Sequence, residues 1–263
     1  HAGLAQGLDG TDMGIGPGAA AGQDQADAGG GQDAGDAGLW AGRGSGMTHQ
    51  AGDTAERDVV LIGAGGHAHV VADMLAALGR PVRGFIAPTG STVIEGIDWL
   101  GTDDVLAEIL PGTADLAMGV GSAGDVSLRR RMFDGLHWAG HLLPPLVHPA
   151  AAVSGGVSIA PGVQVMLGAC VQAGVEIGCN AIINTGAIVD HDCRIGDHAH
   201  VAPGAVLCGD VTVGDGAHVG AGARVIQGIS IGEDALVAAG AVVISDVAPG
   251  ARVAGVPAKE MRG

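Results

Sequence analysis

Residues 177–207 read IGCNAIINTGAIVDHDCRIGDHAHVAPGAVL, and this stretch decides the fold of the C-terminal part of the chain. An aliphatic residue returns at every sixth position, and small residues fill most of the places between. The same spacing runs outward in both directions without a miss, over sixteen positions: Val153, Ile159, Val165, Val171, Ile177, Ile183, Val189, Ile195, Val201, Leu207, Val213, Val219, Val225, Ile231, Val237 and Val243. A continuous helix would instead repeat near 3.6 residues, and a flat strand every second residue.

The six-residue beat is typical of the repeat that builds a parallel β-helix. Three hexads form one triangular coil, so the sixteen positions predict about five coils. A deeper repeat of eighteen residues agrees with this, because IGCNAI, IGDHAH, VGDGAH and IGEDAL follow one another at that distance. Each coil stacks on the last at the spacing of neighbouring strands, roughly 4.8 Å, and adds its own aliphatic layer. We expect this β-helix domain to span residues 149–263.

Residues 57–148 carry a different pattern, in which strand and helix signals alternate. Strands are predicted in RDVVLIGAGG (57–66), PVRGFIAP (81–88) and ADLAMGVGS (114–122). Helices are predicted in HAHVVADMLAALG (67–79), TDDVLAEIL (102–110) and DVSLRRRMFDGL (125–136). Gly79 is a good C-cap for the first helix. This order predicts a small Rossmann-like parallel sheet with helices on its faces.

Residues 1–56 form a low-complexity segment of Gly, Ala, Asp and Gln in which eight acidic residues accompany one Arg. This composition has too little apolar surface to offset the entropy of ordering, so we expect a disordered tail. The net charge of −16 argues against a nucleic-acid partner and against an anionic membrane surface. The sequence also shows no membrane-spanning run and no secretory signal, which favours a cytoplasmic protein.

The four cysteines, Cys170, Cys179, Cys193 and Cys208, form no C-x-x-C pair. The chain is not a short secreted one, so a disulfide framework is not expected. We interpret them as reduced, small core or surface residues. Cys193 shares its hexad place with Val157, Val175, Val211 and Ile229, which indicates a core position rather than a nucleophile.

From about residue 58 onward the chain resembles the left-handed β-helix acyltransferases, and within them the PglD, perosamine N-acetyltransferase and NeuD-like sugar acetyltransferases. VLIGAGGHAHVV (60–71), INTGAIVDHDCRIG (183–196) and AGVPAK (254–259) carry the resemblance. It implies a left-handed coil, which departs from the usual right-handed crossover rule. It further implies acetyl-CoA as co-substrate, a nucleotide-linked amino-sugar as acceptor, and a homotrimer with acetyl-CoA between neighbouring β-helices.

His191 is the main candidate for catalysis. Residues eighteen apart are vertical neighbours in the predicted coil, so His191 lies between Ala173 and Gly209, both small. The imidazole therefore stands in a notch, flanked by Asp190 and Asp192, and a neighbouring carboxylate raises its basicity. A surface histidine in a polar turn is the alternative interpretation. The family resemblance favours His191 as the general base, with Asp192 tuning it where some relatives have Glu.

The resemblance assigns further residues. Asn184 supports the same site, although a corner-capping Asn is nearly as good an interpretation. His200 contacts the acetyl-CoA thioester, and Gly209, Ala221 and Ala239 complete the acetyl-CoA site. His200 and His218 are eighteen apart and should stack, so a surface histidine ladder is the alternative. A metal held by His191, His198 and His200 is disfavoured, because the coil places His191 and His200 on different edges.

GAGGHA (63–68) matches a dinucleotide-binding fingerprint between a strand and a helix. The acidic residue that NAD binding requires is missing at the end of the second strand, where Ala87 and Pro88 stand, so we do not expect NAD. By resemblance, Gly65, Gly66, His67 and Gly121 bind the nucleotide-sugar instead. Many relatives are acidic at the positions of Ala87 and Pro88, which leaves the nucleotide and the sugar open.

The predicted function is therefore N-acetylation of a nucleotide-linked amino-sugar by direct attack on acetyl-CoA, without a metal. O-acetylation of a sialic acid or another sugar hydroxyl is the alternative within the same class. A non-catalytic β-helix that binds or scaffolds is the alternative from a different class, and the His191–Asp192 pair argues against it. A serine acetyltransferase-like enzyme is disfavoured by the α/β part of the chain.

Overall fold

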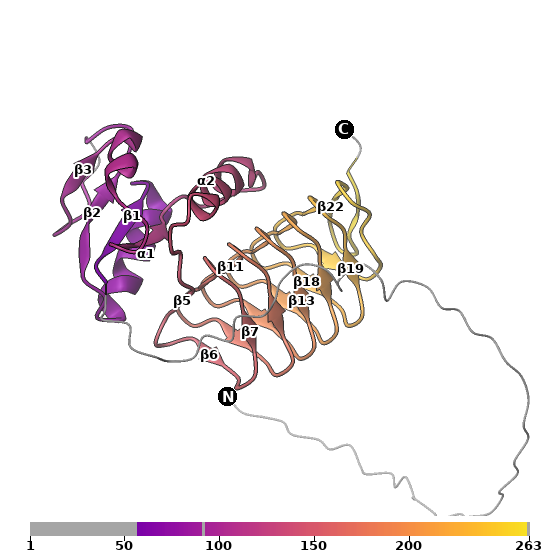
Figure 1. Cartoon of the computed structure of the whole chain (residues 1–263). Helices are drawn as coiled ribbons and strands as arrows, with labels where there is room; N and C mark the ends of the chain where they lie inside the picture. Colours follow the sequence, from indigo (N-terminus) through magenta and orange to yellow (C-terminus); the bar gives the residue numbers. More distant parts are fainter. Residues whose placement is uncertain (1–56, 91–92, 262–263) are drawn as a thin grey trace, which may run out of the picture. The chain divides into compact units, whose positions relative to one another are not determined.

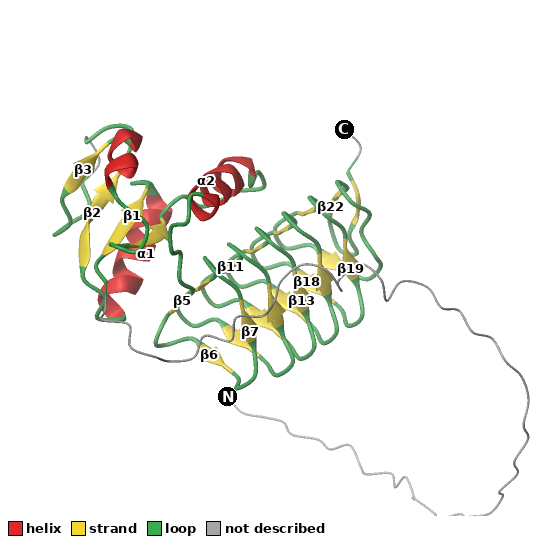
Figure 2. Cartoon of the chain, viewed as in Figure 1, coloured by secondary structure: helices red, strands yellow, loops and turns green. Residues whose placement is uncertain are grey.

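The computed structural model describes residues 57–90 and 93–261. The predicted tail, 1–56, lies outside the described residues. Figure 1 shows an α/β part followed by a ladder of short strands that stack coil upon coil, and Figure 2 shows how much of each coil is turn. No helix among the described residues is long and apolar enough to cross a membrane.

The α/β part is a four-stranded parallel sheet in the order β3-β2-β1-β4. Its strands are β1 (Val59–Ile62), β2 (Val82–Ile86), β3 (Trp99–Gly101) and β4 (Asp115–Met118). Its helices are α1 (Gly66–Ala77), the 3₁₀ helix η1 (Asp103–Glu108) and α2 (Ser127–Trp138). The predicted parallel sheet is confirmed, and β3 is an edge strand that the sequence pattern did not predict.

Helix α1 begins directly after the glycine turn and ends where the sequence predicts. Gly79 has a φ of +68° and follows the last turn, as a glycine in the left-handed conformation often does. The buried face of α1 includes Val71, Met74 and Leu75. The amino end of this helix is thereby fixed beside the carboxyl ends of β1 and β4.

The β-helix has three parallel sheets, one for each side of the triangular coil. The first runs through β5 (Leu146–Val147), β8 (Gln164–Val165), β11 (Ile182–Ile183), β14 (His200–Val201), β17 (His218–Val219), β20 (Leu236–Val237) and β22 (Arg252–Ala254), with β23 (Lys259–Glu260) antiparallel at its end. The second runs through β6 (Ala152–Val153), β9 (Cys170–Val171), β12 (Ile188–Val189), β15 (Val206–Leu207), β18 (Arg224–Val225) and β21 (Val242–Val243). The third runs through β7 (Ser158–Ile159), β10 (Glu176–Ile177), β13 (Arg194–Ile195), β16 (Thr212–Val213) and β19 (Ser230–Ile231).

The five strands of the third sheet agree with the predicted number of coils. Strand β5 already pairs with β8, so the first rung lies just before residue 149. The division of the chain into domains at 148/149 stays a prediction.

The hexad pattern explains the coil. The aliphatic residue of each strand points inward, and a second inward place four positions later holds mostly Ala or Val, such as Ala181, Ala199 and Val211. The residue just before the second inward place has a left-handed backbone in most coils, a conformation that Gly adopts freely and Asn or Asp tolerates. This residue is mostly Gly. The other residues found there are Asn180, Asp192, His198, Asp210 and Asp234, which have φ between 52° and 60°.

The outward residue of each strand gives the three sides different surfaces. The covered face consists of Gln164, Ile182, His200, His218 and Leu236, and the first three are buried because the α/β part packs against them. The apolar open face consists of Ala152, Cys170, Ile188, Val206, Arg224 and Val242, and it is partly or fully exposed. The polar open face consists of Ser158, Glu176, Arg194, Thr212 and Ser230.

Candidate active site

His191 lies in the turn between β12 and β13, at the border of the apolar open face. Its Nδ1 is 2.8 Å from Oδ2 of Asp192. A carboxylate oxygen accepts, so Nδ1 carries the proton and donates, and Nε2 of the neutral ring keeps its lone pair. A Cβ placed on Gly209 would lie 2.5 Å from both Nε2 and Cε1, so the ring rests directly over that glycine. The predicted notch is present in the structure, and among the described residues no hydrogen bond ends on the basic nitrogen of the ring.

The surroundings of His191 make it a better base. The hydrogen bond to Asp192 raises the pKa of His191, and the charges of Asp190, Asp192 and Asp210 act in the same direction. The backbone N–H of His191 donates to Oδ1 of Asp190 at 2.8 Å, which orders the turn. The His191 and Asp192 side chains are 61% and 66% exposed, so a substrate can reach them.

The conformation of Asp192 is set by the coil. Its φ of 60° is the left-handed conformation that most turns of the β-helix have at this place. Its Oδ1 stands above Gly174, where any side chain would collide with it. Gly174 therefore leaves the room that the Asp192 carboxylate needs to reach the imidazole.

His200 is only 5% exposed and uses both ring nitrogens within the protein. Nδ1 is 3.0 Å from the carbonyl oxygen of Ser122 and 2.9 Å from its hydroxyl. A carbonyl only accepts, so Nδ1 is the protonated nitrogen, and Nε2 accepts from Nδ2 of Asn184 at 2.9 Å. Burial lowers the pKa of His200 to about 3, and His218, His67 and Arg129 add to this effect. His200 is therefore a neutral, fixed acceptor.

Asn184 is joined to His200 rather than to His191. Its Oδ1 accepts from the backbone N–H of Thr185 at 2.7 Å, which fixes the amide so that Nδ2 faces His200. Within the described ranges no hydrogen bond links Asn184 with His191. The expected partnership of these two residues is thus not made inside one chain.

Ser122 is a site residue that the sequence interpretation missed. It follows Gly121 at the end of the run that contains β4, and it brings the α/β part into contact with His200. The signal that could have found it was its position, since ligands gather at the carboxyl ends of parallel strands.

The predicted nucleotide-sugar residues lie together at the amino end of α1. Gly65 and Gly66 are exposed, and added Cβ atoms there would meet nothing within 4 Å. A Cβ on Gly121 would lie 3.1 Å from Cβ and Cγ of His67, so these two residues are neighbours. Nε2 of His67 contacts Oε1 of Gln164, on the covered face, at 2.8 Å. His69, one helical step further on, is exposed.

Arg129 is the second residue that the sequence interpretation missed. It is fully buried, and its guanidinium donates to the carbonyl oxygens of Val120 at 2.6 Å and Asn180 at 3.3 Å, and to Oε1 of Gln164 at 3.2 Å. Burial lowers its pKa to about 9, so it stays charged at neutral pH. Its spacing from Phe133 and Leu136 puts it on the buried face of α2, and that spacing was the available signal.

Other predicted residues have simpler surroundings. His200 and His218 are register partners in neighbouring coils, as predicted, and their rings meet edge to face with centroids 4.9 Å apart. Ala221 and Ala239 are exposed, so a ligand can reach them. They lie in turns on the same corner of the β-helix as Thr185, the neighbour of Asn184. The described part of the chain holds no group of three His, Cys, Asp or Glu side chains placed for a metal ion.

The four cysteines are free, as predicted. Cys193 is buried, donates to the carbonyl of Cys208 at 3.2 Å, and has its pKa raised to about 11 by burial. A thiol with so high a pKa is almost wholly protonated at neutral pH and is a poor nucleophile. The structure thus supports its interpretation as core.

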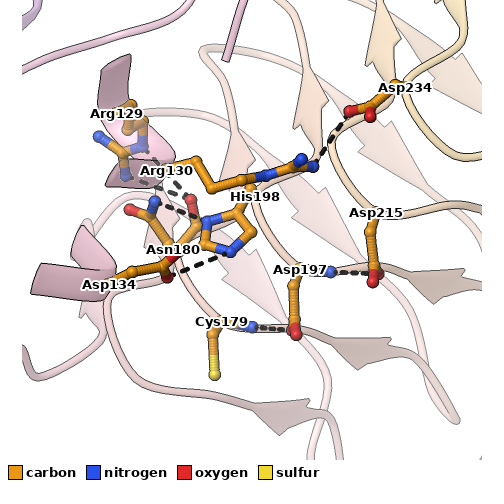
Figure 3. A network of polar contacts seen from close by, with 9 residues as sticks. All are labelled: Arg129, Arg130, Asp134, Cys179, Asn180, Asp197, His198, Asp215 and Asp234. Atoms are coloured by element: carbon orange, nitrogen blue, oxygen red, sulfur yellow. Dashed lines mark hydrogen bonds and ion pairs between the residues drawn. The ribbon is translucent and has the colours of Figure 1, made fainter. Parts of the chain in front are cut away.

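A second polar network holds α2 to another corner of the β-helix (Figure 3). Nδ1 of His198 lies 3.0 Å from Nδ2 of Asn180, and Asp134 of α2 lies 3.6 Å from the other ring nitrogen. Arg130 of α2 forms an ion pair with Asp234 at 3.0 Å. His198 is therefore engaged in packing α2, which agrees with its exclusion from the candidate site.

The aspartates of this corner support one another from coil to coil. Asp197 accepts from the backbone N–H of Cys179 at 2.7 Å, and Asp215 accepts from that of Asp197 at 2.9 Å (Figure 3). These bonds satisfy turn amides that the sheets leave unpaired, so the row of acidic residues is structural.

Comparisons with known proteins agree with the fold. Residues 58–136 match the PglD N-terminal domain, and residues 174–209 match the bacterial transferase hexapeptide family over six repeats. A search of curated protein sequences gave no match.

Several solved structures are similar. A variant of perosamine N-acetyltransferase from Caulobacter crescentus, in complex with CoA and GDP-perosamine, is 39% identical with a TM-score of 0.74, over 81% of this chain and 100% of that one. The acetyltransferase domain of PglB from Neisseria gonorrhoeae, in complex with acetyl coenzyme A, is 37% identical with a TM-score of 0.74, over 78% and 100%. WeeI from Acinetobacter baumannii shares the fold at 22% identity and a TM-score of 0.63, over 78% and 100%.

The fold and these similarities thus define a class of acetyltransferases in which an α/β part precedes a parallel β-helix. The chain belongs to the hexapeptide-repeat acyltransferases with a PglD-type N-terminal domain, the family of perosamine N-acetyltransferase.

Proposed function

We propose that the protein is an acetyltransferase that moves the acetyl group of acetyl-CoA to the amine of a nucleotide-linked amino-sugar. The observation that carries this proposal is the His191–Asp192 pair, with Nδ1 held by the carboxylate and Nε2 free above Gly209. The similar structures support the substrate class, because one contains CoA with GDP-perosamine and another contains acetyl coenzyme A.

His191 acts as general base on the attacking amine. The neutral amine nitrogen attacks the thioester carbonyl carbon, a C–N bond forms, and the C–S bond breaks as CoA leaves as thiolate. Nε2 of His191 takes the proton that the amine must lose, and the imidazolium then returns it to the thiolate. Asp192 stabilises the imidazolium and fixes the tautomer, which is the same division of labour as in a Ser-His-Asp triad.

The nucleotide part is held at the glycine turn. The backbone N–H groups of Gly65 and Gly66 at the start of α1 favour a phosphate group, and both residues are exposed. Ser122 directly follows Gly121 in the sequence, and its carbonyl oxygen accepts from Nδ1 of His200. The nucleotide-sugar site and the predicted acetyl-CoA site therefore adjoin.

His200 acts on acetyl-CoA through Asn184. Both nitrogens of His200 are occupied, by Ser122 and Asn184, so the ring positions the amide. The Asn184 amide has a second N–H, and across the described part of the chain no acceptor contacts it. This N–H is the donor we assign to the carbonyl oxygen of the thioester. Such a donor stabilises the charge that develops on the oxygen in the transition state.

The active form is a homotrimer built on the apolar open face. Ile188 on that face is 41% exposed, and Val206 and Val242 lie in the same column. A second copy that covers this face would also cover the border where His191 lies. A neighbouring chain could then bring its Asn184 to His191, which supplies the partnership that one chain does not make.

The reaction is placed in the cytoplasm. The four cysteines are free, which fits a reducing compartment.

The experiment is a substrate panel. Purified full-length protein is given acetyl-CoA with GDP-, UDP- and dTDP-linked 4-amino sugars and with the matching 4-hydroxy sugars, and CoA release and product mass are measured. We expect one or more amino-sugars to gain one acetyl group on nitrogen. Transfer to hydroxy sugars alone would replace the proposal with O-acetylation, and no transfer to any member would refute the proposed substrate class.

A further inference from the structure

The Gln164 side chain is oriented by two partners of opposite kind. Its Nε2 donates to the carbonyl oxygen of Met118 at 2.8 Å, and its Oε1 accepts from Nη2 of Arg129 at 3.2 Å. Exchanging the two atoms would set an amide N–H against a guanidinium N–H and an oxygen against a carbonyl oxygen. The position of Oε1 is therefore fixed, and Gln164 is buried.

The orientation of Gln164 determines the tautomer of His67. Nε2 of His67 lies 2.8 Å from that same Oε1, which can only accept. Nε2 must therefore carry the proton, and in the neutral ring Nδ1 carries the lone pair. This tautomer is the opposite of that of His191, whose proton is on Nδ1.

Nδ1 of His67 lies next to Gly121, where an added Cβ would lie 3.4 Å from it. Among the described residues no hydrogen bond ends on Nδ1, and it is not one of the buried unpaired polar atoms. Nδ1 is thus an acceptor that is open to solvent, in the residue that directly follows the exposed Gly65 and Gly66.

Charges around His67 oppose a second proton. Arg129 of α2 is fully buried and positively charged, and the nearby His200 of β14 is neutral. Burial and Arg129 lower the pKa of His67 to about 4. The imidazole is thus neutral across the physiological range and cannot serve as a cation for phosphate.

We propose that His67 is a specificity-determining residue, which accepts a hydrogen bond at Nδ1 from an N–H or O–H group of the nucleotide-sugar rather than contacting a phosphate oxygen. This inference rests on the proposed function and deepens it. The residues of the G-G-H turn then have different roles. The backbone N–H groups of the glycines bind the phosphate, and the histidine ring accepts from a donor on the base or on a sugar.

The first test concerns the tautomer and needs no substrate. Long-range ¹H–¹⁵N spectra of protein labelled at histidine, with the His67 signals assigned by their loss in His67→Asn, should show a neutral ring protonated at Nε2 from pH 5.5 to 7.5. A ring protonated at Nδ1, or one that becomes charged above pH 5.5, would overturn the inference.

The second test compares two variants that each keep one half of the imidazole. The Asn amide in His67→Asn can place an acceptor at the position of Nδ1, whereas the longer side chain of His67→Gln reproduces the contact of Nε2 with Gln164. Affinities for GDP-perosamine, GDP-mannose and UDP-glucose are measured by calorimetry. We expect His67→Asn to bind within about 3-fold of wild type and His67→Gln to bind about 10-fold or more weakly, as for a bound donor left without its acceptor.

The pH dependence of wild-type binding separates the two roles. Binding of GDP-mannose, which has no amine on its sugar and no terminal phosphate, should change less than about 2-fold between pH 5.5 and 7.5. A fall of about 10-fold over that range, or His67→Gln binding better than His67→Asn, would overturn the role of His67 and leave the proposed function intact. Failure of the wild type to bind any of the three probes would instead count against the proposed function and this inference together.

Discussion

Gly209→Ala changes the surface on which the His191 ring lies and leaves both side chains of the catalytic pair unaltered. The added Cβ would lie 2.5 Å from Nε2 and Cε1 of the imidazole, whereas non-bonded carbon atoms settle at about 3.5–4.0 Å. The ring must therefore move by about 1 Å or more, and a misplacement of that size costs about 10²-fold in rate. Gly209 does not need the left-handed conformation, so its backbone accepts alanine. The displaced ring is exposed and swings outward, so stability should change by less than about 1 kcal/mol.

The assay is kcat/KM for CoA release, with Tm measured on the same samples. Gly155→Ala is the matched control, because Gly155 stands in the same column of the coil and an added Cβ there meets nothing within 4 Å. We expect the control to match wild type in rate and Tm. A Gly209→Ala enzyme within about 2-fold of wild type would refute the claim that the position of the ring matters, and an equal loss in the control would assign the effect to the coil rather than to His191.

Further predictions follow from the contacts described. Asp192→Asn replaces the carboxylate that raises the pKa of His191 by a neutral amide, so the acidic limb of the kcat/KM profile should move to lower pH and the maximum should fall, because a weaker base remains. An acidic limb that does not move would show that Asp192 does not set the pKa of His191. Adding Asp192→Asn to His191→Ala should cost little more than His191→Ala alone, and multiplying losses would contradict a pair that acts as a unit. Ile188→Glu on the apolar open face should convert the trimer to monomers, as measured by light scattering, and abolish activity. Ser158→Glu on the polar open face should have neither effect. A wild-type protein that is a fully active monomer would refute a site shared between neighbouring chains. Removal of residues 1–56 should leave activity and Tm unchanged, and a large loss of either would show that the segment contributes.

The β-helix could be predicted from the sequence because its information is local and repeated. Each hexad contains an inward residue, a residue suited to the left-handed turn and a second inward residue. Because one coil has eighteen residues, residues eighteen apart in the sequence are predicted to be vertical neighbours. The stacking of His200 on His218, the small neighbours of His191 and the burial of Cys193 all follow from that count.

The site was less predictable where two distant segments meet. Ser122 and His200 are 78 residues apart, and Arg129 and Gln164 are 35 apart, with no period connecting them. Which side of the coil the α/β part covers depends on packing between surfaces that no repeat in the sequence encodes. Strand β3 was not predicted for a different reason. It has only three residues, lies at the edge of its sheet, and is too short to show a hydrophobic pattern.

The central claim is that His191 is the general base for acetyl transfer, and His191→Ala tests it most directly. The measurement is kcat at saturating acetyl-CoA and the best amino-sugar of the panel, with Tm and assembly state checked in parallel. The predicted result is a fall of about 10² to 10⁴-fold with unchanged Tm, because the side chain is largely exposed and contributes no core packing. Turnover close to that of the wild type would contradict the account.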